Sequence, residues 1–267
     1  KKIPAVGGDL TPVWHESPMY FAQGSSLQTV VLGLARAAAQ ANKNKLAVLY
    51  CAEAAVCGQI NGILVDGGAS SQGASVAYSA RISLAQPDFT SECISARNAG
   101  ATALSVVADV GTTNRVAASC ARQGYKPQYI NTGNTVNGPQ EQNPNLAGMI
   151  TTQNWFGWAT TTGAAAEYQE AMKRYAPDLP STAGTASVWA AGQLLARALR
   201  DVGPEPVTSQ VILDRLWSLK GETLGGLAPE LTFSKGKPTV AARCYFVQQI
   251  KGGRWTPLDG GRPQCLK

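Results

Sequence analysis

The chain has 267 residues and a net charge of +6, from 23 basic and 17 acidic side chains. This length exceeds one typical domain and predicts either two lobes or a single large α/β unit. The basic residues are scattered without a dense tract, which argues against a nucleic-acid partner. Hydrophobic residues make up 44% of the chain, so we expect it to fold rather than to remain disordered. The apolar run at 30–41 is too short to span a membrane and is interrupted by Arg36.

The expected elements begin with a strand at 1–8, which enters a glycine-containing turn, and a helix at 27–40. Between residues 45 and 152, short apolar runs alternate with polar turns and segments of helical periodicity. Such runs are typical of buried parallel strands, and the segments between them are long enough for crossover helices. The expected strands are 46–50, 75–82, 103–107, 128–130 and 148–151, and the expected crossover helices are 59–70, 91–99 and 114–123. This alternation predicts an open α/β lobe, which binds ligands at the carboxyl ends of its strands.

The pattern changes after residue 152. A loop dense in aromatic side chains at 155–158 leads into a helical region. The expected helices are 162–175, 183–202 and 208–219, and the expected strands at the end of the chain are 230–233, 241–250 and 254–258. The sequence Lys251-Gly252-Gly253 supplies a hairpin turn between the last two strands.

Six cysteines fit neither a zinc spacing nor a Cys-x-x-Cys redox motif: Cys51, Cys57, Cys93, Cys120, Cys244 and Cys265. Only one histidine is present, so we expect no metal site. Disulfides are the better interpretation, and the alternative is buried free thiols. Of the fifteen possible pairings, the one local in sequence is 51–57, 93–120 and 244–265. An even number of paired cysteines indicates oxidation outside the cytoplasm, as expected for an exported chain whose signal peptide has been removed.

The motifs of common enzyme classes are missing from the sequence. We find no Gly-x-Ser-x-Gly elbow, no phosphate-binding Gly-x-x-x-x-Gly-Lys and no His-Glu-x-x-His. With a single histidine, the chain has few side chains suited to general acid–base catalysis. We therefore expect a binding protein without a cofactor rather than an enzyme, although an enzyme on a flavodoxin-like fold remains an alternative.

Five segments carry a family resemblance in the same order along the chain. They are IPAVGGDLTP (3–12), YFAQGSSLQTVVLGLARAAA (20–39), LAVLYCAEAAVCGQ (46–59), DFTSECISARNAGATAL (88–104) and ARQGYKPQYINTGN (121–134). Together they resemble the type I periplasmic solute-binding proteins of ABC importers, and within them the branched-chain amino-acid binding proteins. The resemblance implies two α/β lobes that close on a small solute, a membrane permease as partner, and a periplasmic or extracellular location with a possible membrane anchor. A ligand-sensing receptor or regulator domain of the same fold is the main alternative.

The resemblance also implies a division into lobes. Residues 1–22 and 154–240 would form what remains of the first lobe, and residues 23–153 and 241–267 would form the second. Relatives begin with strand–helix units that precede this sequence, so we expect the first lobe to be incomplete and to favour association through its uncovered edge.

The resemblance places the solute site on both lobes. Leu10 and Thr11 lie at a turn that would offer backbone groups and a hydroxyl to a carboxylate, unless the turn only caps a helix. Trp189 stands where relatives place an aromatic side chain that faces the cleft. In the second lobe, Cys57 stands where relatives have an aromatic residue. A disulfide to Cys51 would then take the place of that aromatic wall of the site.

The loop at 131–134 follows a strand of the second lobe and lacks the acid with which amino-acid-binding relatives hold an ammonium group. Thr132 lies in this loop, and the amides of Asn131 and Asn134 could serve a neutral polar ligand as donors and acceptors. Asp109 follows another strand, where it would either face the cleft or cap the next helix. An unpaired buried ammonium group is costly. Unless Glu53 or Asp109 substitutes for the missing acid, we expect a small neutral or carboxylate-bearing organic solute, with or without a ring, rather than an ordinary amino acid.

Overall fold

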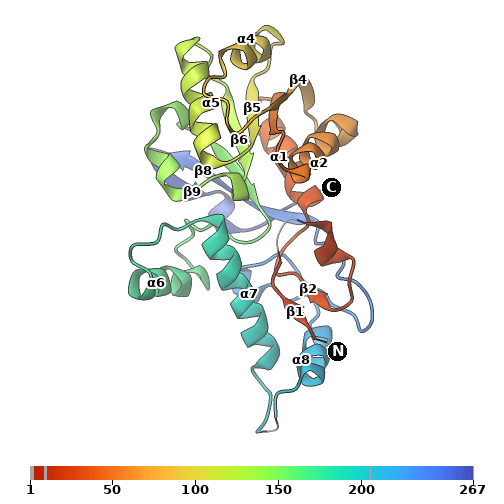
Figure 1. Ribbon diagram of the computed structural model, residues 1–267. Helices are drawn as coiled ribbons and strands as arrows, with labels where there is room; N and C mark the ends of the chain where they lie inside the picture. The colour runs from red at the N-terminus through yellow and green to blue at the C-terminus, as the bar shows by residue number, and fades with distance from the viewer. Residues whose placement is uncertain (1–2, 9–10, 205, 267) are drawn as a thin grey trace. The chain divides into compact units, whose positions relative to one another are not determined.

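The computed structural model describes residues 3–8, 11–204 and 206–266. The chain divides into two compact units (Figure 1). The first unit contains residues up to 29, residues 154–246 and residues from 259 onward, and the second contains residues 30–153 and 247–258. Each unit is described by itself below.

The second unit is built on a parallel sheet whose strands alternate with helices. Its strands follow the order β8–β7–β6–β5–β3–β4, with β9 antiparallel beside β8. Strand β3 pairs in parallel with both β4 and β5, β5 pairs with β6, and β6 pairs with β7. The strand bounds are β3 Lys45–Cys51, β4 Ser75–Ile82, β5 Ala103–Val107, β6 Gln128–Thr132, β7 Ile150–Gln153, β8 Cys244–Lys251 and β9 Arg254–Pro257. The predicted parallel sheet is confirmed.

Helices cover both faces of this sheet, with α1 and α2 on one face and α4 and α5 on the other (Figure 1). Their bounds are α1 Leu27–Gln40, α2 Ala55–Ile63, α3 Ala69–Ser71, α4 Thr90–Asn98 and α5 Val110–Arg122. Every residue of β5 is buried, because a central strand of a doubly covered sheet is shielded on both sides. In the edge strand β4 only Ile82 is buried. The helix expected at 59–70 is interrupted by a π-helical turn at Leu64–Gly68, in which Gly67 has a φ of +101°.

The first unit holds a two-stranded parallel sheet, a helical layer and an aromatic core. Strands β1 Ala5–Val6 and β2 Tyr20–Phe21 pair in parallel, and β10 Gln264–Cys265 pairs antiparallel with the start of β8. Its helices are α6 Ala165–Tyr175, α7 Ala183–Leu199 and α8 Ser209–Ser218. The aromatic loop belongs to the core: Trp155 Nε1 donates to the carbonyl oxygen of Ala183 at 2.9 Å, and the rings of Phe156 and Tyr168 meet edge to face at 5.2 Å.

One expectation for this unit was wrong, and another is confirmed only in part. The strand expected at 230–233 is a single antiparallel bridge between Glu222 and Leu231. The alternation of buried and exposed residues there is real, since Leu231 and Phe233 are buried, but the facing segment turns at Gly221, where φ is +61°, so no ladder forms. The strand expected at 1–8 is reduced, among the described residues, to Ala5–Val6.

Three disulfides join the cysteines in sequence-local pairs: Cys51 with Cys57, Cys93 with Cys120, and Cys244 with Cys265. The first two lie in the second unit, where one links β3 to α2 and the other links α4 to α5. The third links β8 to β10. The expected pairing agrees with the structure.

Candidate functional site

The strand order places a topological switch point between β3 and β5. From β3 the chain moves to β4 on one side, and from there it crosses to β5 on the other side and continues outward to β6 and β7. In doubly wound sheets, ligands bind in the crevice outside the carboxyl ends of the strands at such a point. The segments that follow Cys51 and Val107 flank it, so the candidate site of the second unit lies there.

A disulfide closes the loop that follows β3. Cys51 is the last residue of β3, and Cys57 lies in the first turn of α2. Cys57 is buried, with 6% of its surface exposed. At this position the site therefore has a disulfide, which fixes the start of α2 against the end of β3.

Asp109 lies two residues after the end of β5 and is the N-cap of α5. Its Oδ1 accepts a hydrogen bond from the backbone N–H of Thr112, and its Oδ2 accepts one from the Thr112 hydroxyl, both at 2.9 Å. Partial burial would raise the pKa of the Asp109 carboxyl, but these bonds and the nearby Arg115 together lower it below its usual value. The side chain is exposed and ionised at neutral pH, and it serves as a helix cap.

The second acid at this edge, Glu53, also has structural partners. Its Oε1 accepts hydrogen bonds from the Ser83 hydroxyl at 2.7 Å and from the backbone N–H of Leu84 at 2.9 Å. These bonds, led by the one from Ser83, lower the pKa of the Glu53 carboxyl. Glu53 thus ties the end of β3 to the loop after β4.

The end of β6 and the turn after it carry two amides with different environments. Asn131 is fully buried: Oδ1 accepts from the backbone N–H of Val106 at 2.9 Å, and Nδ2 donates to the Val106 carbonyl at 3.0 Å. Thr132 is buried at the end of β6, whereas Asn134 is exposed in the 3-10 turn that follows. Asn131, considered from the sequence as a possible ligand contact, instead connects β5 to β6.

The remaining sequence-predicted residues belong to the first unit. Leu10 lies outside the described residues. Thr11 is exposed directly before the 3-10 turn Pro12–His15. Trp189 lies on α7 with its ring 6.1 Å from that of Tyr168. The structure therefore brings Cys57, Asp109 and Thr132 to one edge of the second unit's sheet, and it places Thr11 and Trp189 in the first unit.

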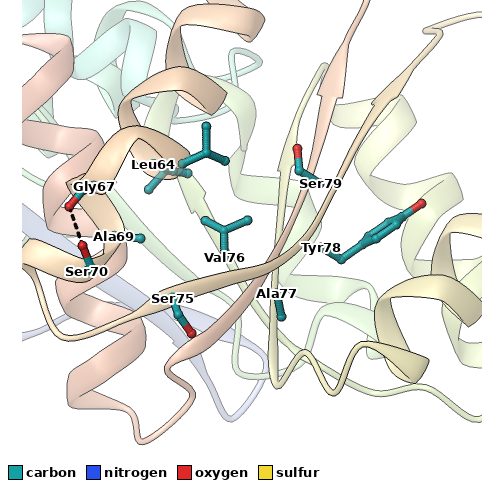
Figure 2. A pocket seen from close by; sticks show the side chains of 10 residues that line it. Leu64, Gly67, Ala69, Ser70, Ser75, Val76, Ala77, Tyr78 and Ser79 are labelled. Carbon is teal, nitrogen blue, oxygen red and sulfur yellow. Dashed lines mark hydrogen bonds between the residues drawn. The ribbon is translucent and has the colours of Figure 1, made fainter.

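A hollow of about 350 Å³ in the second unit does not belong to this edge. Figure 2 shows Leu64 and Val76 facing each other across it. Ser75, Tyr78 and Ser79, which also line it, lie on β4 with Val76. These are residues of the first five positions of β4, so the hollow lies toward the amino end of the edge strand. Ligands of parallel sheets bind at the opposite end. We therefore do not assign the solute site to this hollow.

The sequence reasoning missed a second hollow, of about 460 Å³, which lies within the first unit between α6 and α7. Trp189 and Tyr168 belong to its wall, and Gly184 and Gly192 leave space on the α7 side. The sequence signal was the pair of glycines eight residues apart inside a helix, where glycine is unfavourable. Among the described residues, no group of three or more His, Cys, Asp or Glu side chains could hold a metal ion.

The family description that matches the chain is "Periplasmic binding protein", over residues 1–254. The chain belongs to the periplasmic binding protein family. Membership implies an extracytoplasmic location and a solute-binding rather than an enzymatic class of protein. Within the described residues, no helix is long and apolar enough to cross a membrane. None of the curated proteins compared with the chain matches it.

Solved structures of similar fold include three with different solutes in their names. A branched-chain amino-acid ABC transporter protein from Thermus thermophilus with bound valine has a TM-score of 0.75 and 17% identity, over 99% of this chain and 73% of that chain. A solute-binding protein from R. palustris in complex with benzoate has a TM-score of 0.69 and 14% identity, over 94% and 68%. A fatty-acid ABC transporter substrate-binding protein from Thermomonospora curvata has a TM-score of 0.70 and 14% identity, over 94% and 66%. At these identities the likeness establishes the type I periplasmic binding protein fold.

Proposed function

We propose that this protein binds a small organic solute outside the cytoplasm and delivers it to the membrane permease of an ABC importer. The observation that carries the proposal is the match to the periplasmic binding protein family over residues 1–254. The switch point between β3 and β5 supports it, because that is where folds of this kind bind ligands.

We further propose that the solute is neutral or bears a carboxylate, and that it is not an ordinary amino acid. The carboxylates of Asp109 and Glu53 accept hydrogen bonds from the chain itself, from Thr112 and from the Ser83–Leu84 loop. An ammonium group would have to compete with these bonds for its counter-charge, and an unpaired buried ammonium is costly. Thr132 and Asn134 remain the proposed polar contacts of the second unit. In the first unit, Thr11 remains the proposed polar contact and Trp189 the proposed aromatic contact.

Domain closure of such a protein depends on the solute binding the closed state better than the open state. The test is a thermal-shift panel on the protein with aliphatic amino acids, aromatic acids and aromatic amides. We expect stabilisation by aromatic acids or amides. Stabilisation by leucine or valine at micromolar concentration, with none by the other classes, would contradict the proposed solute class while leaving the transport role intact.

A further inference from the structure

Residues 83–86 form a tight turn directly after β4, at the carboxyl edge of the second unit's sheet. Cys51 pairs with Ile82, so β3 and β4 end at the same level. The backbone N–H of Gln86 donates to the carbonyl oxygen of Ser83 at 3.1 Å and closes the turn. The 83–86 turn belongs to no strand of the described chain, so its position depends on bonds from its neighbours.

Glu53, in the segment after β3, holds the 83–86 turn from one flank of the switch point. Its Oε1 accepts hydrogen bonds from the Ser83 hydroxyl at 2.7 Å and from the backbone N–H of Leu84 at 2.9 Å. Bonds to a carboxylate are charge-assisted and stronger than bonds between neutral groups. The backbone N–H of Ala52 also donates to the carbonyl oxygen of Ile82 at 2.8 Å, directly before the turn. The first flank and the turn are therefore bonded together.

Arg115, in the second turn of α5, holds the 83–86 turn from the other flank. Helix side chains lean toward the amino end of the helix, and this guanidinium group reaches back to the start of α5. Its Nη2 donates to the carbonyl oxygen of Leu84 at 2.7 Å and to the Thr112 hydroxyl at 2.8 Å, and its Nε donates to the carbonyl oxygen of Gln86 at 3.2 Å. The Thr112 hydroxyl in turn donates to Asp109 Oδ2 at 2.9 Å.

These bonds form one continuous chain across the carboxyl edge, from Glu53 through the 83–86 turn to Arg115 and Asp109. Its two ends lie in the segments that flank the switch point, after Cys51 and after Val107. A guanidinium group suits the middle of such a chain, because its fork of donors bonds several acceptors in a fixed geometry. A loop that is already ordered loses less conformational entropy when a ligand binds beside it.

We propose that Glu53 and Arg115 are positioning residues of the solute site. Together they clamp the 83–86 turn in one conformation and so fix the spacing of the two flanks of the switch point. This inference rests on the proposed solute-binding function. Each side chain acts through the turn rather than by touching the solute, and loss of either one weakens solute binding.

The clamp itself is tested without a ligand, by NMR measurement of hydrogen exchange at the backbone N–H of Gln86. This N–H bonds to Ser83 inside the turn, and neither substituted side chain bonds to it. Glu53→Ala and Arg115→Met should each raise its exchange rate by about tenfold or more, the effect of losing a hydrogen bond to a charged group. The double variant should exceed the faster single variant by no more than about twofold, because the turn needs both anchors.

The matched control is Arg122→Met on the same helix. The Arg122 guanidinium group bonds Asp88 and Ser119 and makes no bond to the 83–86 turn among the described residues. This variant should leave the exchange rate at Gln86 unchanged. Circular dichroism confirms that all variants fold.

The role in binding is tested with benzoate and benzamide as probes, by isothermal titration calorimetry. Arg115→Met and Glu53→Ala should weaken binding of whichever probe the parent binds by about fivefold or more, the effect of having to order the turn on binding. Glu53→Gln should recover the affinity that Glu53→Ala loses, because its amide oxygen can accept the same two bonds. Arg122→Met should bind the probe as the parent does.

An unchanged exchange rate at Gln86 in either single variant, or a rise seen only in the double variant, would overturn the clamp. Equal affinity of Arg115→Met and the parent, or equal losses in Arg115→Met and Arg122→Met, would overturn its role in the site. If the parent binds leucine instead of either probe, the proposed solute class fails, and the same comparison with leucine decides the inference. If no compound of the thermal-shift panel binds the parent, the proposed function fails and the role in the site fails with it.

Discussion

Asn131→Ala should destabilise the second unit strongly although it removes only one side chain. The ladder between β5 and β6 consists of the pairs Ala103–Gln128 and Leu104–Tyr129, and beyond them the Asn131 amide bonds both backbone groups of Val106. Alanine would leave a buried N–H and a buried carbonyl without partners. Each such group costs about 1–3 kcal/mol, so the expected loss is about 2–6 kcal/mol of the free energy of unfolding.

The assay is urea unfolding followed by far-ultraviolet circular dichroism at pH 7. The matched control is Asn134→Ala, three residues away, whose side chain is exposed. This change should alter the free energy of unfolding by no more than about 0.5 kcal/mol. If Asn131→Ala unfolds within about 0.5 kcal/mol of Asn134→Ala, the amide does not replace the missing ladder bonds and the reasoning is refuted.

Three further predictions concern stability. Replacing Cys93 and Cys120 by alanine opens a loop with a sequence separation of 27 and should cost about 3–4 kcal/mol in urea unfolding, whereas no loss would show that the bridge does not form. Asp109→Ala should cost about 1 kcal/mol at pH 7. Because the folded-state pKa of Asp109 is lowered, its contribution to the free energy of unfolding is present above the ordinary pKa of 3.8 and disappears as the pH falls through the folded-state pKa. A variant as stable as the parent at pH 7 would contradict the role of Asp109 as a helix cap. Burial lowers the pKa of His15, against the raising effect of its bond to the Thr239 carbonyl, so the free energy of unfolding should fall as the pH drops below 6.5. Because the chain has one histidine, His15→Gln should remove this pH dependence of the free energy of unfolding. An unchanged pH dependence would contradict the assignment.

The sequence predicted the elements whose signal is local. The helix at 27–40 and the strands at 75–82 and 103–107 have the predicted bounds, because each follows from its own hydrophobic period and from the turn residues beside it. The disulfides were predictable for the same reason, since each joins neighbouring elements. The element at 230–233 was not, because its burial pattern comes from packing and the segment that would pair with it turns away at Gly221.

The candidate site was predictable to a smaller extent. The position of Asp109 after a strand placed it at the carboxyl edge of the sheet, but only coordinates show that Thr112 occupies both carboxylate oxygens. The burial of Asn131 depends on where β5 and β6 diverge, which no local pattern encodes. The hollow beside Gly192 depends on how two helices separated by a loop face each other, and a glycine in a helix does not by itself reveal the space next to it.

The central claim is that the protein binds a small organic solute outside the cytoplasm for import. Its most direct test is native mass spectrometry of the protein purified without added ligand, followed by identification of whatever is released on denaturation. The account predicts one small organic compound bound in a one-to-one complex, without an ammonium group. Release of an aliphatic amino acid would contradict the proposed solute class. A solute-free protein whose melting temperature no compound of the thermal-shift panel raises would contradict the claim itself.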